Sequence, residues 1–342
     1  MNSKQQKLQK MKRTFKNILP IVLLLATVQL FAQVEKEGKE KKERQRYEFF
    51  KERNISKTYP ASGNTLNIDN QFGTVKIITW DKNEIKVDIH IETSSTNKEL
   101  ADKTFEKIDV TDKQEGKEIY FKTTMNKNKE EDKVKCDNCS NTMSIDYTIQ
   151  MPASNALKIN NSFGSIEIPD YAGPVWLTNK YGHLTAGKLS KPEKIWVEFG
   201  KADLKSIGNI DLTFKYTSVN IGSLTGNSKL RFEFCGYSKV NLDNGLTSLT
   251  VNDSYSSLHL VPAANLAATY TISTSYGSFV DKSNAGIIRT DSPEKYGPDL
   301  NKHYEGKSGT GAVKIDIKSS FGNIMIGEGT KEDMKPKKKV RS

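Results

Sequence analysis

The sequence has few of the residues that build most enzyme sites. Among its 342 residues are three cysteines and four histidines, and the histidines are scattered at positions 90, 183, 259 and 303. It has no G-x-S-x-G motif, no phosphate-binding glycine loop and no cluster of His and Cys at metal-ligand spacing. We therefore expect a non-catalytic protein that uses no cofactor and no metal.

Cysteine is scarce, and two of the three cysteines lie close together. Cys136 and Cys139 form a C-x-x-C pair in a polar segment, whereas Cys235 lies in a strand-like stretch. In an oxidising compartment the pair is a candidate disulfide. Unpaired thiols, or a redox or metal role, are the alternatives, although zinc usually takes four ligands and a redox pair usually opens a helix in a βαβ unit.

Long apolar runs are absent except near the N-terminus. Six Lys and Arg residues without an acid precede an apolar stretch at residues 18–30, and Ala32 offers a small residue before Gln33. This pattern is typical of a secretory signal peptide over residues 1–32, and the stretch is shorter than the roughly 20 residues that span a bilayer. An uncleaved anchor is the alternative. We expect an exported protein of the periplasm, or one that is secreted or displayed at the cell surface.

The middle of the chain carries almost no net charge. The net charge is +11, but six positive charges lie in residues 1–32 and a net +4 lies in residues 331–342, which leaves +1 for residues 33–330. A nucleic-acid-binding domain would need a basic folded part, so we expect no nucleic-acid partner. The basic tail at residues 329–342 is either an inert solvated segment or a weak contact to anionic membrane or polysaccharide.

The chain before residue 153 divides into two parts. Residues 33–55 are dense in Glu, Lys and Arg and predict a charged linker or a short solvated helix. Residues 56–152 predict an N-terminal β region, because apolar residues alternate with polar ones at 85–91. A helix-like insert is expected at residues 97–105. We expect this β region to cap one end of the repeats that come after it.

A repeat begins at residue 153 and continues to residue 328. Each unit has two short alternating apolar pieces with a polar turn and one aromatic residue between them, and successive aromatics lie 17 to 21 residues apart. Turns that stack like on like explain such constant spacing. The sequence therefore predicts an all-β, parallel β-helix-like solenoid with rungs of roughly 17–21 residues. An insert at about 282–311 is expected to be a loop that leaves the coil.

The recurring aromatic residues are the main site candidates. One interpretation is an internal structural ladder at a corner of the coil, where offset rings stack. The other is an exposed column that stacks on sugar rings. The candidate column comprises Phe72, Phe163, Tyr181, Phe199, Tyr216, Tyr237, Tyr255, Tyr276 and Phe321.

Outward carboxylates give a weaker, enzymatic hypothesis. Polysaccharide-active β-helix enzymes pair acids at a fixed gap. Here the outward acids are dispersed among Lys, Thr and Ser, so catalysis is a distant alternative. The acids concerned are Glu167, Asp203, Asp211 and Asp243.

Three phrases carry a resemblance to a known family. They are the run of residues 68–75 (IDNQFGTV), the run of residues 80–85 (WDKNEI), and the recurring Phe/Tyr-Gly-x-Ile-x-Ile pattern. Over about residues 56–328 the chain resembles a family of bacterial putative adhesins of unknown function, with a repetitive β-solenoid similar to auto-transporter-adhesin-like head domains. The resemblance implies an envelope location and supplies no catalytic residues.

Two functions are suggested by the residues and the resemblance together. In the first, the chain is a non-catalytic, adhesin-like binding or scaffold module whose solenoid faces meet an envelope protein or a glycan. In the second, it is an accessory of envelope-stress or sigma-factor signalling, as some relatives look to be. Exposed apolar or aromatic patches on one face favour the first.

Overall fold

The computed structural model describes residues 46–126, 134 and 136–334, so the expected signal peptide and residues 335–342 of the basic tail lie outside it. The described chain is almost entirely β-structure, with one α-helix, α2 (Lys98–Glu106), and one 3-10 helix, η2 (Lys331–Met334). The strands are β1 Phe49–Pro60, β2 Thr65–Gln71, β3 Val75–Trp80, β4 Glu84–Ser95, β5 Ile108–Glu115, β6 Glu118–Met125, β7 Asn141–Pro152, β8 Ala156–Ser162, β9 Ile166–Ile168, β10 Tyr171–Lys180, β11 His183–Gly208, β12 Asp211–Glu233, β13 Tyr237–Ser254, β14 Ser257–Pro262, β15 Ala268–Ser275, β16 Ser278–Lys282, β17 Ile288–Arg289, β18 Asn301–Lys307, β19 Val313–Ser320 and β20 Asn323–Gly327. None of the helices in these ranges is long and apolar enough to cross a membrane.

Alternation of apolar and polar residues decides which face of each strand is buried. In β4, Ile85, Val87, Ile89 and Ile91 are all at most 1% exposed, while the residues between them are partly exposed. The repeated strands follow the same rule. The buried aliphatic side chains of successive strands join into one continuous core.

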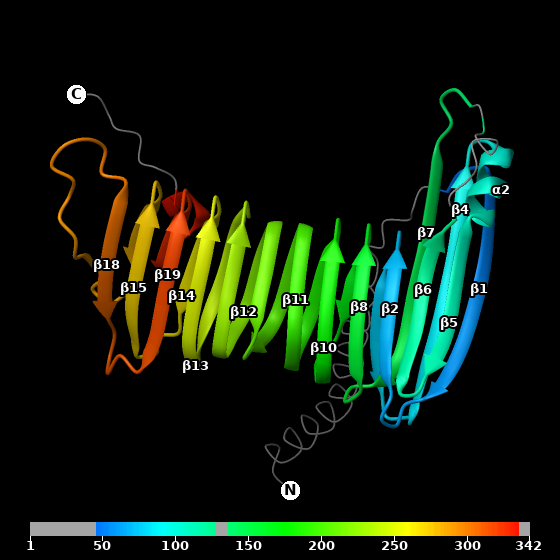
Figure 1. Cartoon of the computed structure of the whole chain (residues 1–342), viewed down its shortest axis with the longest axis horizontal. Coiled ribbons are helices and arrows are strands. Elements are labelled where there is room, and N and C mark those ends of the chain that lie inside the picture. Colours follow the sequence, from blue (N-terminus) through cyan, green and yellow to red (C-terminus); the bar gives the residue numbers. More distant parts are fainter. Residues whose placement is uncertain (1–45, 127–133, 135, 335–342) are drawn as a thin grey trace, which may run out of the picture. The chain divides into compact units, whose positions relative to one another are not determined.

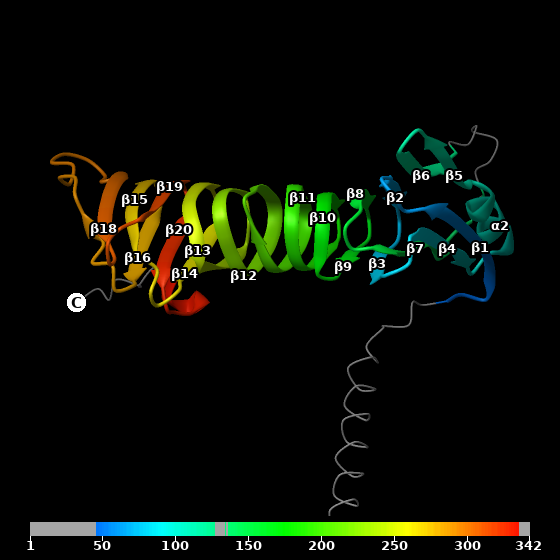
Figure 2. The same cartoon turned by 90° about the horizontal axis from the view of Figure 1, so that it is seen from below.

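The repeated strands pair in parallel, and like residues meet like residues. Ile159 of β8 is opposite Leu177 of β10, which is opposite Ile195 of β11, which is opposite Leu212 of β12. A second parallel ladder runs through β7, β3, β9 and the first residues of β11. The two ladders are visible as successive arrows in Figures 1 and 2.

A tight bend joins the two ladders, and glycine is required there in several rungs. A Cβ added to Gly182 would lie 1.7 Å from the carbonyl oxygen of Gly164, and one added to Gly164 would lie 1.8 Å from that of Gly73. Backbones of neighbouring rungs therefore approach too closely for a side chain. In other rungs Thr217 or Cys235 occupies this place and hydrogen-bonds to the backbone instead.

The N-terminal region differs from the expected linker. Strand β1 begins at Phe49 and pairs antiparallel with β4 over its whole length, so the prediction of a linker up to residue 55 is wrong for its last seven residues. Its charged residues form an edge strand, where charged side chains discourage pairing with other chains. The helix-like insert is confirmed as α2, whose first turn is capped by Asn97 Oδ1 accepting from the Leu100 N–H.

This region also covers the first rung. Strand β6 pairs in parallel with β2, and β5 pairs antiparallel with β6. Strand β7 pairs in parallel with β3 and antiparallel with β4. Both ladders are thus extended beyond their first repeated strands, which leaves β1 and β5 as the edges.

The C-terminal rungs do not stack in sequence order. Strand β19 pairs on one side with β13 and on the other with β15, and β20 lies likewise between β14 and β16. The rung formed by β19 and β20 is the last in sequence. In space it lies between the rung of β13 and β14 and the rung of β15 and β16. The segment expected to be a loop also differs, because it forms β17 and β18, and β18 covers the edge of β15 by antiparallel pairing.

Candidate functional site

The aromatic residues at the bends form one continuous stack. Consecutive ring centroids are 4.6 to 5.1 Å apart, and interplanar angles range from 0° to 11°. We call these nine rings the aromatic column. In spatial order they are Phe72, Phe163, Tyr181, Phe199, Tyr216, Phe234, Tyr255, Phe321 and Tyr276.

Tyr237 does not belong to the column, and this corrects the sequence prediction. Phe234 occupies its place, while the Tyr237 hydroxyl hydrogen-bonds to His259 Nδ1 at 2.8 Å. Both residues stand two positions after a buried side chain, Phe234 after Phe232 and Tyr237 after Cys235. The sequence pattern therefore does not separate them, and the positive φ belongs to Phe234.

The column lies on the surface, which corrects the expectation of an internal ladder. The rings from Phe163 onward are between 40% exposed, at Phe199, and 57% exposed, at Tyr276, and Phe72 is partly buried. The reason is the backbone, since each of these residues has a φ between 50° and 63°. At this left-handed bend the aromatic points outward, and the residue two positions earlier fills the interior.

The stack limits what the column can bind. Each inner ring has both faces covered by its neighbours, so only ring edges and the tyrosine hydroxyls face outward. The two end rings, Phe72 and Tyr276, each stack on one neighbour within the column. Sugar stacking on ring faces, one of the two interpretations, therefore does not suit the middle of the column. The edges form an apolar ridge instead.

The three cysteines show no reactive arrangement. Cys136 and Cys139 are joined in a disulfide. Cys235 is buried, its Sγ–H donates to the Phe214 carbonyl at 3.3 Å, and burial raises the pKa of its thiol, which keeps it protonated and unreactive.

The four outward acids of the enzymatic hypothesis each find a separate partner. Asp203 meets Lys201 at 2.7 Å and His183 at 2.8 Å, and the other three contact residues of their own neighbouring rungs. These contacts are Glu167 with Lys76, Asp211 with Lys229, and Asp243 with Ser223. No two of the four acids share a partner here, so they offer no acid–base pair.

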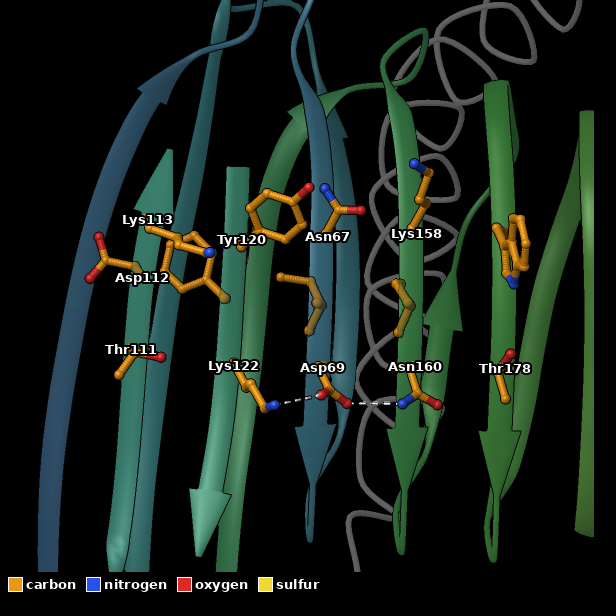
Figure 3. A pocket seen from close by; sticks show the side chains of 14 residues that line it. Asn67, Asp69, Thr111, Asp112, Lys113, Tyr120, Lys122, Lys158, Asn160 and Thr178 are labelled. Carbon is orange, nitrogen blue, oxygen red and sulfur yellow. Dashed lines mark hydrogen bonds and ion pairs between the residues drawn. The ribbon is translucent and has the colours of Figure 1, made fainter. Parts of the chain in front are cut away.

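A cleft that was not apparent from sequence patterns opens on the outer face of the first ladder. It has a volume of about 570 Å³ and lies over β2, β8 and β10, with β5 and β6 along one side. Figure 3 shows the side chains that line it, with Asp69 between Lys122 and Asn160. Volumes of a few hundred Å³ lined by aromatic and a few polar groups are typical of ligand sites. Its lining residues are Asn67, Ile68, Asp69, Thr111, Asp112, Lys113, Tyr120, Phe121, Lys122, Lys158, Ile159, Asn160, Trp176 and Thr178.

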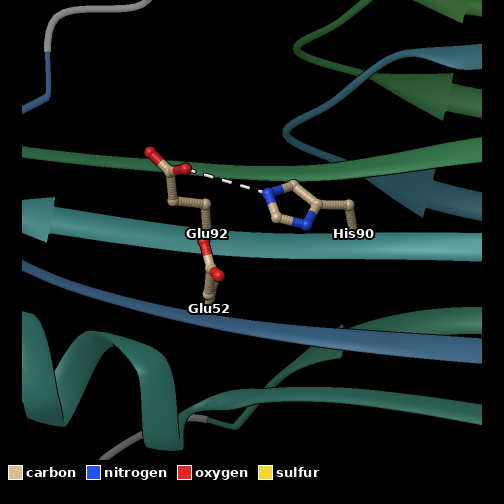
Figure 4. A group of neighbouring side chains, drawn as sticks. All are labelled: Glu52, His90 and Glu92. Atoms are coloured by element: carbon tan, nitrogen blue, oxygen red, sulfur yellow. Dashed lines mark ion pairs between the residues drawn. The ribbon is translucent and has the colours of Figure 1, made fainter.

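One histidine also comes close to two acids. Glu52 of β1 is directly opposite Glu92 of β4, and His90 Nε2 lies 3.7 Å from Glu92 (Figure 4). The side-chain ligand atoms lie within 4.8 Å of one another. His90 Nδ1 is 2.8 Å from Asn54 Oδ1. Antiparallel pairing of β1 with β4 creates this group, which sequence spacing alone does not reveal.

Comparisons with known proteins give structural neighbours only. No family model and no curated protein matches the sequence. The chain is similar to a structure named as a putative cell adhesion protein from Clostridium sporogenes, with 15% identity, a TM-score of 0.22, and coverage of 82% of this chain and 100% of the other. It is also similar to a putative adhesin from Bacteroides fragilis, with 12% identity, a TM-score of 0.36, and coverage of 80% and 97%.

A third neighbour is a putative adhesin from Parabacteroides merdae, with 8% identity, a TM-score of 0.27, and coverage of 83% of this chain and 98% of the other. TM-scores of this size do not establish a common fold. The names are those of the neighbours, and by themselves they say nothing about what this chain binds.

Proposed function

We propose that this chain is a non-catalytic, exported envelope protein, an adhesin-like binding or scaffold module that uses the faces of a β-solenoid. The parallel register supports the solenoid, because Ile159, Leu177 and Ile195 follow one another at steps of one repeat and lie side by side. Such stacking gives a rigid surface on which outward residues form straight rows.

The single observation that carries this proposal is the exposed aromatic column. Nine stacked rings extend over roughly 40 Å, taking about 4.8 Å per strand step. Large apolar side chains exposed in one continuous row are uncommon on a soluble surface and mark interaction sites. Phe and Tyr are also enriched in the centres of protein interfaces. The ridge of ring edges suits a groove on a partner protein.

In-cell cross-linking of a tagged chain, followed by mass spectrometry, tests the proposal. We expect one envelope protein to be captured in quantity by the natural sequence. A variant with Tyr181→Ala, Phe199→Ala and Tyr216→Ala should lose at least about tenfold of that capture, since it removes the middle of the ridge. The matched control is Tyr181→Phe with Tyr216→Phe, which keeps every ring.

Equal capture by the alanine variant, with its fold verified by circular dichroism, would refute binding through the column. The identity of the captured protein separates the two functional candidates. A membrane-bound regulator would support the accessory of envelope-stress or sigma-factor signalling. A surface protein or polysaccharide would support adhesion.

A further inference from the structure

Strand register places two rows of outward side chains side by side across the cleft. The first row crosses β6, β2, β8 and β10, and the second runs parallel to it two residues further along each strand. Side chains two apart on a strand share a face, so both rows point out of the sheet. The first row is Tyr120, Asn67, Lys158 and Trp176, and the second is Lys122, Asp69, Asn160 and Thr178.

Aromatic rings stand at the two ends of the first row. Tyr120 and Trp176 are separated by two strands, which corresponds to roughly 14 Å at about 4.8 Å per step. Trp176 is 41% exposed and is not part of any aromatic stack among the described residues. Unlike the inner rings of the aromatic column, it therefore has ring surface that a ligand can reach.

A second tryptophan continues this surface beyond the cleft. Trp196 is opposite Thr178, and Lys194 Nζ lies 4.9 Å from the Trp176 ring centre and 5.5 Å from that of Trp196. The indole N–H of Trp196 is buried and has no hydrogen-bond partner within the described ranges. Two of the three tryptophans of the chain thus lie on one outer face, with an ammonium group between them.

Two lysines between the aromatic ends have only long ion pairs, so they are available to a ligand. Lys158 Nζ is 3.6 Å from Glu118, and Lys122 Nζ is 4.0 Å from Asp69, so both pairs are long. Exposed pairs of this kind contribute little to stability and exchange partners easily.

The acids of the cleft are bound more closely to other groups. Asp112 hydrogen-bonds to the Tyr59 hydroxyl, and Lys57 lies 3.3 Å from it. Asp69 accepts from the Asn160 amide at 2.9 Å. The lysines are therefore the groups that an incoming carboxylate or sulfate meets.

We propose that the cleft is a binding subsite for an acidic oligosaccharide, with a sugar ring packed on Trp176 and an acidic group held by Lys158 and Lys122. The inference rests on the proposed binding function and names one ligand class for it. Amide oxygens and nitrogens of Asn67 and Asn160 line the path between the aromatic ends, where sugar hydroxyls would lie. Aromatic surface with a few placed polar groups is the composition that ligand sites share.

Isothermal titration of the full exported chain with a uronic-acid oligosaccharide tests this subsite. The matched probe is the same oligosaccharide after carboxyl reduction, which removes the charge and keeps the sugar rings. We expect the acidic form to bind about tenfold more tightly than the reduced form. Raising the salt concentration should narrow that difference because it screens the lysines.

Three variants separate the roles of ring and charge. Trp176→Ala should weaken binding of both probes about tenfold or more. Lys158→Gln should weaken only the acidic probe. Lys229→Gln is the control, because Lys229 is exposed on the same ladder, outside the cleft, and pairs with Asp211 at 4.0 Å. It should leave both affinities unchanged.

Several outcomes would overturn the inference. An equal loss with Lys229→Gln would show binding to surface charge in general. Equal affinity for both probes would remove the role of the acid group, and tight binding of a poly-glutamate peptide in their place would point to a protein ligand. If no probe binds at millimolar concentration, the subsite does not exist, while capture of a partner through the aromatic column stands or falls separately.

Discussion

At the residue scale, the nine aromatic residues of the column hold a left-handed backbone that side-chain-bearing residues rarely adopt. Such strain costs about 1–3 kcal/mol at each position. A stacked pair contributes about 0.5–1.5 kcal/mol, and eight pairs serve nine rings. Summed over the column, the backbone strain is about twice the stacking energy, so folding stability alone does not account for the column. This supports a role for it in binding.

Because Phe234, and not Tyr237, belongs to the column, its ring should contribute stacking energy to the fold. Phe234→Ala removes two stacked pairs, with Tyr216 and Tyr255, and should lower the free energy of unfolding by about 2 kcal/mol. Tyr296→Ala is the control, since that ring is 82% exposed and outside the column. Urea unfolding measures both. A loss no larger than the control's would show that stacking contributes nothing.

Adding a single methyl group at a bend glycine should destabilise the fold more than removing an aromatic ring from the column. In Gly182→Ala the new methyl carbon would lie 1.7 Å from the Gly164 carbonyl oxygen, so neighbouring rungs must separate. We expect a loss of about 3 kcal/mol or more, in the range of overpacked cores. At Gly245 the nearest atom to an added Cβ is 3.4 Å away, and Gly245→Ala should change the melting temperature little. Equal melting temperatures for the two variants would contradict the close approach.

At the scale of elements, the interior of the bend changes character along the ladder. Asn70 and Asn161 are buried and hydrogen-bonded to each other at 3.1 Å in the first rungs. Phe214 and Phe232 pack together in the middle. Asp253 follows on β13, where it accepts from Ser319 Oγ of β19. The contact between β13 and the inserted β19 therefore contains a buried carboxyl group.

Asp253 predicts a pH dependence of that contact. Burial raises the pKa of its carboxyl, which is 6% exposed and whose Oδ1 has no partner among the described residues. The folded state then binds the proton more tightly than the unfolded state. The group destabilises the fold progressively as pH rises from the ordinary aspartate pKa through the raised one, and the penalty is complete above it.

Asp253→Asn should remove this penalty. We expect the variant to gain stability relative to the natural chain at pH 7 and to lose that advantage near pH 3. Denaturant unfolding at both pH values measures the difference, with the outward Asp243→Asn as control. A variant less stable than the natural chain at pH 7 would show that the Asp253 carboxylate stabilises the contact.

At the scale of the whole described unit, the order of rungs decides which edges need protection. Strand β19 has partners on both sides, and β18 covers the edge of β15. An exposed strand edge is a template for pairing with other chains. Because β19 lies between β13 and β15, this one strand covers an edge of each of them.

Truncation tests this arrangement. A chain that ends at Lys307 lacks β19, β20 and η2, so β13 and β15 each lose a parallel partner. We expect it to associate into oligomers and to lose hydrogen-exchange protection in β13 to β16, as seen by size exclusion and mass spectrometry. A chain that ends at Met334 should stay as the natural one. Unchanged protection in the shorter chain would mean that β13 and β15 can pair directly.

Local patterning in the sequence by itself determined the all-β class, the alternation of buried residues and α2. These features depend on neighbours a few residues apart, such as the buried run Ile85, Val87, Ile89 and Ile91. The aromatic column was found for eight of its nine rings for the same reason. Tyr237 was chosen over Phe234 because both fit the repeat spacing, and only the backbone φ at the bend distinguishes them.

Tertiary structure alone decided the rest. Strands β15 and β19 carry the same alternation, so the sequence pattern does not say which one packs on β13. The outward direction of the rings depends on the φ of each bend residue, a property that apolar patterning does not encode. The cleft exists because β6 pairs with β2, placing Tyr120 opposite Asn67, 53 residues away along the chain. Contacts between distant segments depend on which edges are free when the strands assemble, and no short stretch of sequence contains that information.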